Sequence, residues 1–345
     1  MRRPAFAAAR REPRRTLLRM PSIIETPPHR LSLDRIERAA RTIDPLFRDS
    51  PQFDCEPLSQ ALGLPSLELK VETMNPLRSF KGRGADFFMH EAADSLAGRA
   101  LVCATAGNWG QAMAWVCRVR GRPLVVYSAA NANPLKLERM RAMGADVRLF
   151  SDDFDAAKAE ARRFCAETGA VFVEDGRDAA ISEGAGTIGL ELLRRGTPFD
   201  TLLLPLGNGA LATGVGRWVK AHAPAVRVVG VAAAGADAMA ASWREGRVIE
   251  RGAVNTIADG IAVRVPVPEA LADMQGTVDE VVLVGEDTIE RAMRLCFRHA
   301  GLMVEPAGVV GLAAVLEHPA LCTGRAATVL CGSNLTAEQV AQWLA

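Results

Sequence analysis

One lysine of the sequence lies where its amine could act as a nucleophile or a base. Lys81 belongs to the segment 75–85, NPLRSFKGRGA, in which Phe80 precedes it and glycines follow it. An amine held partly out of water has a lowered pKa, so more of it is neutral and reactive. A solvated lysine at the start of a helix is the alternative interpretation. The chain has only five lysines, Lys70, Lys81, Lys136, Lys158 and Lys220.

A second segment has the composition of a carboxylate-binding turn. Residues 104–111 read ATAGNWGQ, with small residues placed before a predicted helix. Small residues at a helix N-terminus leave backbone N–H groups exposed, and these groups can hold an anion. The side chain of Asn108 can both donate and accept hydrogen bonds. An ordinary strand-to-helix turn explains the same residues equally well.

A third segment is typical of phosphate binding. Residues 205–214 read PLGNGALATG and contain the pattern G-x-G-x-x-A of dinucleotide sites. A dinucleotide site also needs an acidic residue at the end of the next strand, to hold the ribose. That strand instead ends in VGVAAA over 229–234. The pattern therefore disfavours NAD and favours a single phosphate at a helix N-terminus.

A fourth segment, 329–334 with the sequence VLCGSN, ends the last predicted strand. Its Cys331 is a weak neutral donor and acceptor. No histidine lies nearby in the sequence to activate the thiol, and most buried cysteines are structural. Cys331 is thus either a neutral partner for a ligand or a packing residue.

The elements that must position these segments form an α/β pattern with a parallel sheet covered on both faces. Nine strands at this length predict two sheets, and hence two lobes with a cleft between them. Ligands in such sheets bind beyond the carboxyl ends of the strands. The strands are predicted at Leu67–Val71, Leu101–Ala104, Leu124–Tyr127, Asp146–Phe150, Val171–Val173, Thr201–Leu204, Val226–Val231, Val281–Val284 and Ala327–Cys331. Helices are predicted at Gly110–Arg120, Pro134–Met143, Phe154–Thr168 and Glu286–His299.

Composition excludes several classes of protein. The 345 residues are 49% apolar with a net charge of +1. This charge gives no positive electrostatic field that would attract nucleic acid or an anionic membrane. No apolar run is long enough to span a membrane. The seven cysteines contain no C-x-x-C pair and the five histidines no metal-binding spacing, which disfavours disulfides and zinc. We expect a soluble, cytoplasmic protein. Residues 1–19 hold seven Arg and one Glu and are predicted to be a flexible basic leader.

Taken together and in order, six segments resemble the fold type II pyridoxal-phosphate enzymes, in the serine/threonine dehydratase (ammonia-lyase) group. The resemblance covers residues 42–345 and implies a two-lobed α/β fold, each lobe a mostly parallel twisted sheet flanked by helices. It implies a large pyridoxal-phosphate-binding domain of residues 20–97 and 179–345 and a small domain of residues 98–178. The segments are SFKGRGA, ATAGNWGQ, PLGNGAL, TIADGIAVR (256–264), VEPAG (304–308) and CGSN.

The resemblance also implies roles for single residues. Lys81 would be the catalytic residue and would anchor pyridoxal 5'-phosphate as a Schiff base, with Phe80 packed beside the ring. Asn108 would face the phenolate oxygen of the cofactor and Cys331 its ring nitrogen. The phosphate cradle would be Gly207, Asn208, Gly209, Ala210 and Leu211. Substrate-binding residues would be Arg78, Ser79, Thr105, Ala106, Gly107 and Trp109.

Some positions depart from the family pattern. Ala106 stands where the racemases carry a serine acid/base, which disfavours racemisation. Trp109 replaces a histidine and Arg78 a small or apolar residue, so the β-substituent of the substrate is predicted to be aryl or anionic, unless both residues only pack. Ala232 stands near the place of an acidic cation ligand, so no metal is expected.

The predicted reaction is dehydration and deamination of a 3-hydroxy amino acid, such as threonine or serine, to a 2-oxo acid and ammonia. A neutral Cys331 at the ring nitrogen favours prompt loss of a β-leaving group over transamination. The alternatives are a β-replacement or threonine synthase-like enzyme, and a non-catalytic ligand-binding protein. The expected partner is a small amino acid, not nucleic acid or a membrane, and the expected assembly is a homodimer.

Overall fold

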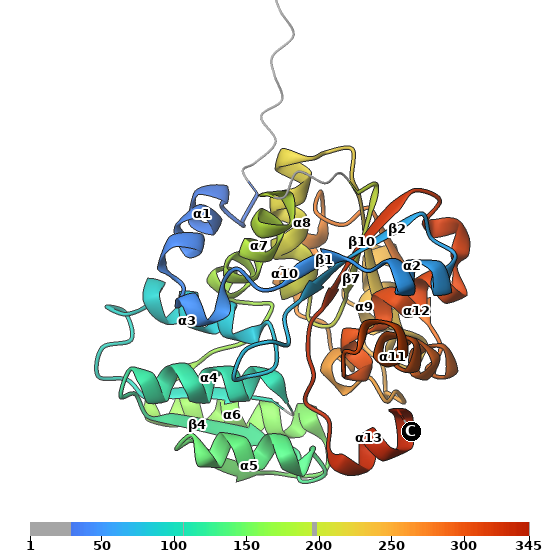
Figure 1. Cartoon of the computed structure of the whole chain (residues 1–345). Helices are drawn as coiled ribbons and strands as arrows, with labels where there is room; N and C mark the ends of the chain where they lie inside the picture. Colours follow the sequence, from blue (N-terminus) through green and yellow to red (C-terminus); the bar gives the residue numbers. More distant parts are fainter. Residues whose placement is uncertain (1–28, 106, 195–198, 345) are drawn as a thin grey trace, which may run out of the picture.

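The computed structural model describes residues 29–105, 107–194 and 199–344, so the expected leader at 1–19 lies outside the described residues. Two β-sheets with helices packed around them make up the molecule (Figure 1). The predicted α/β class with two mostly parallel sheets is confirmed. In the described part of the chain, no helix has the length and apolar character needed to cross a membrane.

The larger sheet has six strands in the order β1-β2-β10-β7-β8-β9. All neighbouring strands are parallel except β1, which pairs antiparallel with β2. The parallel order places the carboxyl ends of β2, β7, β8, β9 and β10 at one edge. Its strands are β1 (Gln52–Asp54), β2 (Ser66–Val71), β7 (Thr201–Pro205), β8 (Arg227–Ala233), β9 (Glu280–Val284) and β10 (Arg325–Leu330).

The smaller sheet has four parallel strands in the order β5-β4-β3-β6. These strands and the helices between them are the green segments at the lower left of Figure 1. They are β3 (Leu101–Ala104), β4 (Leu124–Ser128), β5 (Asp146–Leu149) and β6 (Val171–Phe172).

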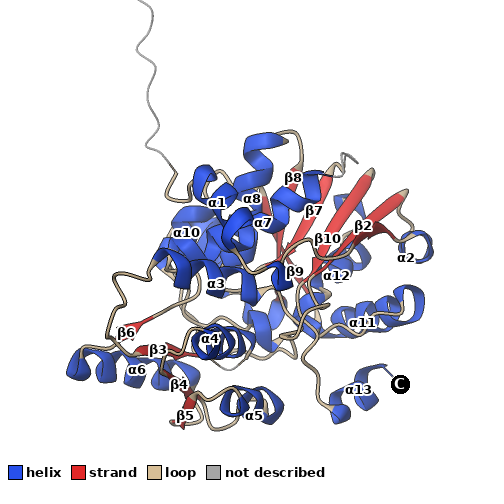
Figure 2. Ribbon diagram, turned by 60° about the vertical axis from the view of Figure 1, so that its left-hand side comes forward, coloured by secondary structure: helices blue, strands red, loops and turns tan. Residues whose placement is uncertain are grey.

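Helices cover both sheets, as the two views together show (Figure 2). The α-helices are α1 (Leu33–Thr42), α2 (Glu56–Leu62), α3 (Lys81–Glu91), α4 (Asn108–Val119), α5 (Pro134–Ala142), α6 (Phe154–Thr168), α7 (Ala179–Arg194), α8 (Ala210–His222), α9 (Ala238–Glu245), α10 (Pro268–Met274), α11 (Glu286–Ala300), α12 (Val310–Glu317) and α13 (Ala337–Leu344). The 3₁₀ turns are Pro45–Phe47, Asp259–Ile261, Pro306–Gly308, Pro319–Leu321 and Ala234–Ala236.

Alternate residues of the central strand β7 enter different cores. Leu203 packs with the cluster that contains α11 and α12. Leu202 and Leu204 pack with the cluster that contains α7 and α8. Because successive side chains of a strand point to opposite faces, an uninterrupted apolar strand of this kind must be covered on both sides.

The nine predicted strands occur with ends no more than two residues from those expected, and one further strand was not predicted. The prediction missed β1, a three-residue edge strand in which Asp54 and its neighbours show no apolar run. The last strand ends at Leu330, so Cys331 lies just beyond it and not inside it as predicted. The helix Phe154–Thr168 has the predicted ends because Asp153 caps its first turn and Gly169 ends it in a left-handed conformation.

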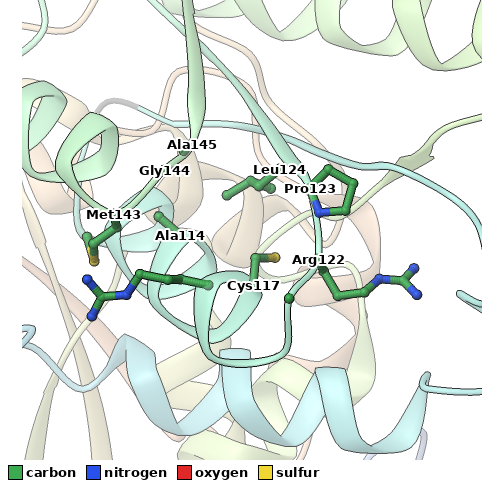
Figure 3. Close-up of a pocket in the computed structure, with 10 residues that line it drawn as sticks. Ala114, Cys117, Arg122, Pro123, Leu124, Met143, Gly144 and Ala145 are labelled. Carbon is green, nitrogen blue, oxygen red and sulfur yellow. The ribbon is translucent and has the colours of Figure 1, made fainter.

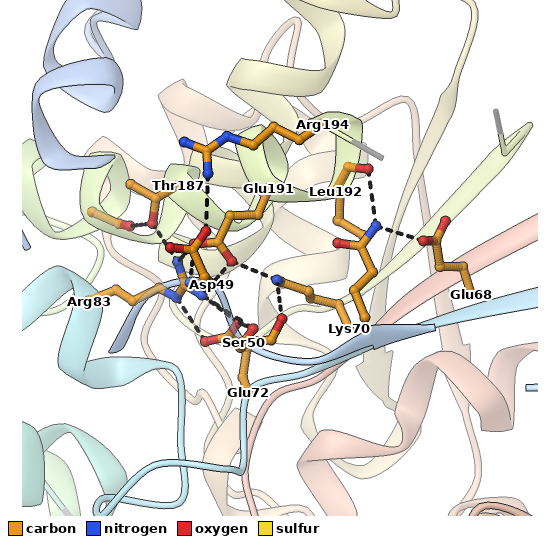
Figure 4. A network of polar contacts seen from close by, with 12 residues as sticks. Asp49, Ser50, Glu68, Lys70, Glu72, Arg83, Thr187, Glu191, Leu192 and Arg194 are labelled. Atoms are coloured by element: carbon orange, nitrogen blue, oxygen red, sulfur yellow. Dashed lines mark hydrogen bonds and ion pairs between the residues drawn. The ribbon is translucent and has the colours of Figure 1, made fainter. Parts of the chain in front are cut away.

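A buried network of charges joins α3 to β2 and α7 (Figure 4). Arg83 is fully buried and donates to both carboxylate oxygens of Glu72 and of Glu191, over distances of 2.6 to 2.9 Å. Lys70 adds a second cation, 2.6 Å from Glu191. Since Arg83 lies two residues after Lys81, this network fixes the first turn of the helix that carries Lys81.

The network makes stability depend on pH in acid. Burial alone raises the pKa of Glu191, but the charges of Arg83 and Lys70 outweigh it and lower the pKa to about 2. An unfolded glutamate titrates near its ordinary value of 4.5. The unfolded chain therefore binds the proton first, and the stabilisation by Glu191 is lost as the pH falls from about 4.5 to about 2.

We expect Glu191→Gln to flatten this dependence. The free energy of unfolding, measured in urea between pH 5 and 3, should fall less steeply for the variant than for the wild type. Glu167→Gln, on the exposed surface of α6, is the control and should keep the wild-type slope. Equal slopes for Glu191→Gln and the wild type would contradict the assignment.

Candidate active site

A cavity of about 870 Å³ lies between the two sheets and is lined by both. The larger sheet contributes Lys81, Asn208 and Cys331 from segments at the carboxyl ends of β2, β7 and β10. The smaller sheet contributes Thr105 and Asp175, which follow β3 and β6. Segments far apart in the sequence thus meet beyond the carboxyl ends of the strands, which is where such sheets bind ligands; we call this the strand-end rule.

Lys81 begins α3 and lies in this cavity. Its Nζ forms an ion pair with Oδ2 of Asp175 and lies 4.7 Å from the centroid of the Phe80 ring. The backbone N–H of Phe80 donates to the carbonyl of Cys331 at 3.1 Å, which holds the start of α3 against the end of β10. Phe80, Lys81 and Cys331 are therefore one assembly.

The loop before α4 connects to the same assembly through Asn108. Its Nδ2 donates to Oε1 of Glu305 at 2.6 Å, and its Oδ1 accepts from Nδ2 of Asn334 at 2.8 Å. Thr105 stabilises the turn, because its Oγ1 accepts from the backbone N–H of Gly107 at 3.0 Å. Two of the predicted segments, 104–111 and 331–334, are thereby joined by side-chain hydrogen bonds.

The glycine loop connects β7 to α8. Gly209 adopts φ +93°, which a residue with a Cβ rarely adopts, and α8 begins at the next residue, Ala210. A Cβ on Gly207 would lie 3.2 Å from the carbonyl oxygen of Gly260, a tight contact that would require the neighbouring backbone to shift by a few tenths of an ångström. The first turn of a helix offers unpaired N–H groups and a positive dipole end, which is a phosphate-binding arrangement.

Two buried groups beside the cavity have raised pKa values. Burial, with a further contribution from Glu305, raises the pKa of the Cys331 thiol, which also lies 3.8 Å from the carbonyl of Ala307. Burial likewise raises the pKa of Glu305, although Lys136 opposes the shift. Cys331 can offer a ring nitrogen a neutral donor but not a counter-charge.

Lys136 is a second lysine of the cavity; it lies in the predicted helix Pro134–Met143 and was not among the predicted site residues. It is 1% exposed, and its Nζ lies 2.7 Å from Oδ2 of Asp259. Burial lowers the pKa of Lys136, but Glu305 and Asp259 outweigh burial and raise it. Lys136 therefore remains an ammonium ion, and a Cβ on Gly107 would lie 3.4 Å from its Nζ.

Comparison with known proteins agrees with this geometry. Residues 43–332 match the family described as pyridoxal-phosphate dependent enzyme. The chain belongs to this family. It is 34% identical over 283 residues to an L-threonine ammonia-lyase of Geobacter sulfurreducens, covering 82% of this chain and 70% of the relative. The recognition of the family from its ordered segments is confirmed.

Solved structures show the same fold. A threonine deaminase of T.th. is 32% identical with a TM-score of 0.82, over 88% of this chain and 99% of that chain. The maize serine racemase is 27% identical with a TM-score of 0.84, over 90% of this chain and 96% of that chain. Pyridoxal phosphate is the cofactor of this family.

The residues of the cavity fit that cofactor. A primary amine at Lys81 is available for a covalent link, and the left-handed Gly209 opens the N-terminus of α8 to a phosphate. The buried indole Nε1 of Trp109 has no hydrogen-bond partner in the described part of the structure, and Trp109 lines the cavity. An orphaned donor of this kind indicates that a polar ligand belongs there.

Not every predicted substrate residue reaches the cavity. Arg78 is exposed, adopts φ +50° and is not among the lining residues. Ser79 is buried, and its backbone bridges to Gly332 instead of facing the space. Ala106 lies outside the described residues. Ala232 is buried within β8, and within the described ranges no cluster of three or more His, Cys, Asp or Glu could hold a metal ion.

A second hollow of about 380 Å³ is separate from these residues (Figure 3). It lies where α4 and α5 end and is lined by Cys117, Arg122 and Met143, among others. Burial raises the pKa of Cys117 to about 12, so its thiol is not a nucleophile near neutral pH. This hollow holds none of the predicted site residues.

Asp175, Lys136, Glu305 and Asp259 were missed as site residues. A signal existed for three of them: Glu305 lies in VEPAG, Asp259 in TIADGIAVR, and Asp175 follows a predicted strand. The strand-end rule that selected Asn108 would also have selected Asp175. Lys136 gave no such signal, because the sequence of a helix does not show which of its polar side chains faces a cleft.

The contact between Gly176 and the glycine loop gives a testable expectation. Gly176 adopts φ +87°, and a Cβ there would lie 2.3 Å from the backbone oxygen of Asn208. We expect Gly176→Ala to displace the loop and to raise the dissociation constant for pyridoxal phosphate on the order of tenfold, which corresponds to about 1.4 kcal/mol.

Gly144→Ala is the matched control, because Gly144 has the same φ of +87° with nothing within 4 Å of an added Cβ. Both variants carry the strain of a left-handed alanine, but only Gly176→Ala should weaken cofactor binding in an absorbance titration. Equal dissociation constants for the two folded variants would contradict this role of the contact.

Proposed function

We propose that this protein is a pyridoxal-phosphate-dependent ammonia-lyase that converts a 3-hydroxy amino acid, such as threonine or serine, to a 2-oxo acid and ammonia. The observation that carries the proposal is the position of Lys81. Its side chain lies in the cavity, beside the hydrogen-bonded segments that contain Cys331 and Asn108. The names of the relatives, a threonine ammonia-lyase and a threonine deaminase, support the same reaction.

We assign the chemical roles as follows. Bound pyridoxal phosphate supplies an electron sink for the negative charge that develops at the substrate Cα. Lys81 holds the cofactor and, once freed, takes the Cα proton at close range. The neutral thiol of Cys331 places no negative charge beside the ring nitrogen, which favours early loss of the β-hydroxyl. Phe80 packs against the site, and the glycine loop of residues 207–211 holds the phosphate.

The substrate carboxylate belongs in the turn before α4. Thr105 shapes this turn, and the N–H groups at the start of the helix offer donors for an anion. Lys136 lies against Gly107 as a permanent cation, so it adds attraction for a carboxylate in the same place. Trp109 lines the cavity next to the turn and limits the space for the side chain.

We further propose the domain organisation and setting of the chain. Residues 98–178 form the small domain, and residues 20–97 and 179–345 form the large, cofactor-binding one. The protein acts as a homodimer in the cytoplasm without nucleic acid or membrane. The balanced charge supports the last point, and the seven cysteines, all free, support a reducing compartment.

Product analysis tests the reaction. The loaded enzyme should release 2-oxo acid and ammonia in equal amounts from serine or threonine. A β-replacement or threonine synthase-like enzyme, the second candidate, would release no 2-oxo acid from any 3-hydroxy amino acid but would turn over with an added thiol or amine. That result would reject the proposal.

A further inference from the structure

We infer that Asp175 is a specificity-determining residue that accepts a hydrogen bond from an uncharged or cationic donor on the substrate β-carbon. The inference rests on the proposed function and narrows its substrate class to amino acids with a β-hydroxyl or a β-ammonium group. It also argues against the anionic β-substituent that the sequence left open.

The first observation is an unsatisfied carboxylate. The side chain of Asp175 is only 9% exposed and lines the cavity. Its Oδ2 pairs with Lys81, whereas its Oδ1 is buried and has no hydrogen-bond partner in the described part of the chain. A buried carboxylate oxygen without a donor is costly, so a donor from the contents of the cavity is expected.

The second observation is that the partner of Oδ2 is needed elsewhere. In the loaded enzyme the amine of Lys81 is used for the covalent link to pyridoxal phosphate, so it no longer pairs with Oδ2 of Asp175 as a free ammonium group. When the substrate frees Lys81, the amine can return only to Oδ2, and Oδ1 is still without a donor. The adjacent Glu174 cannot share a cation with it, because Lys158 and Arg162 are already paired with Glu174. Oδ1 of Asp175 is therefore the oxygen that is left for a donor from the substrate.

An amino-acid substrate has few polar groups to offer. Its α-amine becomes bonded to the cofactor, and its α-carboxylate carries the same charge as Asp175. The carboxylate also has its own proposed place beside Gly107 and Lys136. The β-substituent remains, and it must donate a hydrogen bond to satisfy Asp175. A β-carboxylate would instead be repelled.

The position of Asp175 is fixed by the backbone. It follows β6 and precedes the left-handed Gly176, where an added Cβ would lie 2.3 Å from the backbone oxygen of Asn208. The carboxylate is thus held between the glycine loop and Lys81. A residue placed in this way can discriminate between substrates, because its ion pair with Lys81 shows that the carboxylate lies at the reacting end of the cavity.

A binding experiment tests the inference without turnover. 2-Methylserine and 2-aminoisobutyrate lack a Cα proton and differ only by the β-hydroxyl. The absorbance of the loaded enzyme should show that the wild type binds 2-methylserine about tenfold more tightly. In Asp175→Ala this preference should disappear, and in Asp175→Asn, which keeps a neutral acceptor oxygen, it should be reduced. Asp152→Asn removes an exposed carboxylate at the same cavity and should keep the preference. An unchanged preference in both Asp175 variants would overturn the inference.

Turnover gives a second, independent readout. In Asp175→Asn, kcat/KM should fall about tenfold or more for serine, and further for 2,3-diaminopropionate, because a charged donor loses more. For 3-chloroalanine, whose leaving group is not a hydrogen-bond donor, kcat/KM of this variant should change less than about threefold. For 3-hydroxyaspartate, kcat/KM of Asp175→Asn relative to its value for serine should rise, because the substitution removes the repulsion between Asp175 and the β-carboxylate of the substrate.

The outcomes separate the two proposals. Equal losses for serine and 3-chloroalanine would show a structural role for Asp175 and overturn the inference, while the ammonia-lyase reaction would stand. Wild-type turnover of 3-hydroxyaspartate at the rate of serine would also overturn it. If the wild type released no 2-oxo acid from serine or threonine, the proposed function would fail. The binding experiment would still show whether Asp175 recognises the β-hydroxyl, because it needs no turnover.

Discussion

Replacing Lys81 by alanine is expected to reduce 2-oxo acid release by about 10³-fold, the largest effect of any single substitution. The variant loses the amine that holds the cofactor and the base that takes the Cα proton, and general acid–base catalysis alone contributes about 10² to 10⁴ in rate. Lys81 lies in the cavity, 4.7 Å from the centroid of the Phe80 ring. Initial rates of 2-oxo acid release, at equal cofactor loading, measure the loss.

Lys220→Ala is the control for this result. Lys220 lies on α8 outside the cavity, where its Nζ bonds to the carbonyls of Pro224 and Val226. The Lys220→Ala variant should retain wild-type turnover. A second variant, Lys136→Ala, removes a buried lysine that lines the same cavity and should weaken substrate binding without removing the covalent cofactor absorbance. Full activity in Lys81→Ala would show that a different residue carries the chemistry.

The largest effect on stability is expected for Arg83→Met. The substitution keeps the volume of the side chain but leaves Glu72 without its cation and Glu191 with Lys70 alone. Removing one partner of a buried ion pair typically costs about 3–5 kcal/mol, because the remaining charge is buried without compensation. The free energy of unfolding in urea at pH 7 should fall by about this amount.

Arg163→Met is the matched comparison. Arg163 also forms two ion pairs, with Glu160 and Glu167, but on the exposed surface of α6. Exposed pairs contribute little, so its unfolding midpoint should match the wild type. Arg83→Lys should lie between the two, since it keeps the charge and loses the forked geometry. A wild-type midpoint for Arg83→Met would contradict the assigned role of the network.

Sequence patterns predict the larger features of this fold well, because these depend on local rules. Apolar strands such as Thr201–Pro205 identify a parallel sheet, and capping residues such as Asp153 locate helix ends. The glycine loop at 207–209 is visible for the same reason, since its spacing before a helix has a local physical cause. Strand β1 was missed because a three-residue edge strand has no pattern of its own.

The polar contacts across the cavity could not be derived in this way. The pairs Lys136–Asp259 and Asn108–Glu305 join residues 123 and 197 positions apart, and nothing local connects them. Whether a lysine lies in the cleft or in solvent depends on how the lobes meet. For this reason the local sequence around Lys81 distinguished it among the five lysines, whereas nothing local indicated that Lys136 lies in the same cavity.

The central claim is that Lys81 holds the cofactor, and a single measurement tests it most directly. The holoenzyme is reduced with borohydride, digested, and searched by mass spectrometry for the lysine that carries the pyridoxyl phosphate group. Three lysines line the cavity, Lys81, Lys136 and Lys158. The predicted result is modification at Lys81, and modification at Lys136 or Lys158 in its place would contradict the claim.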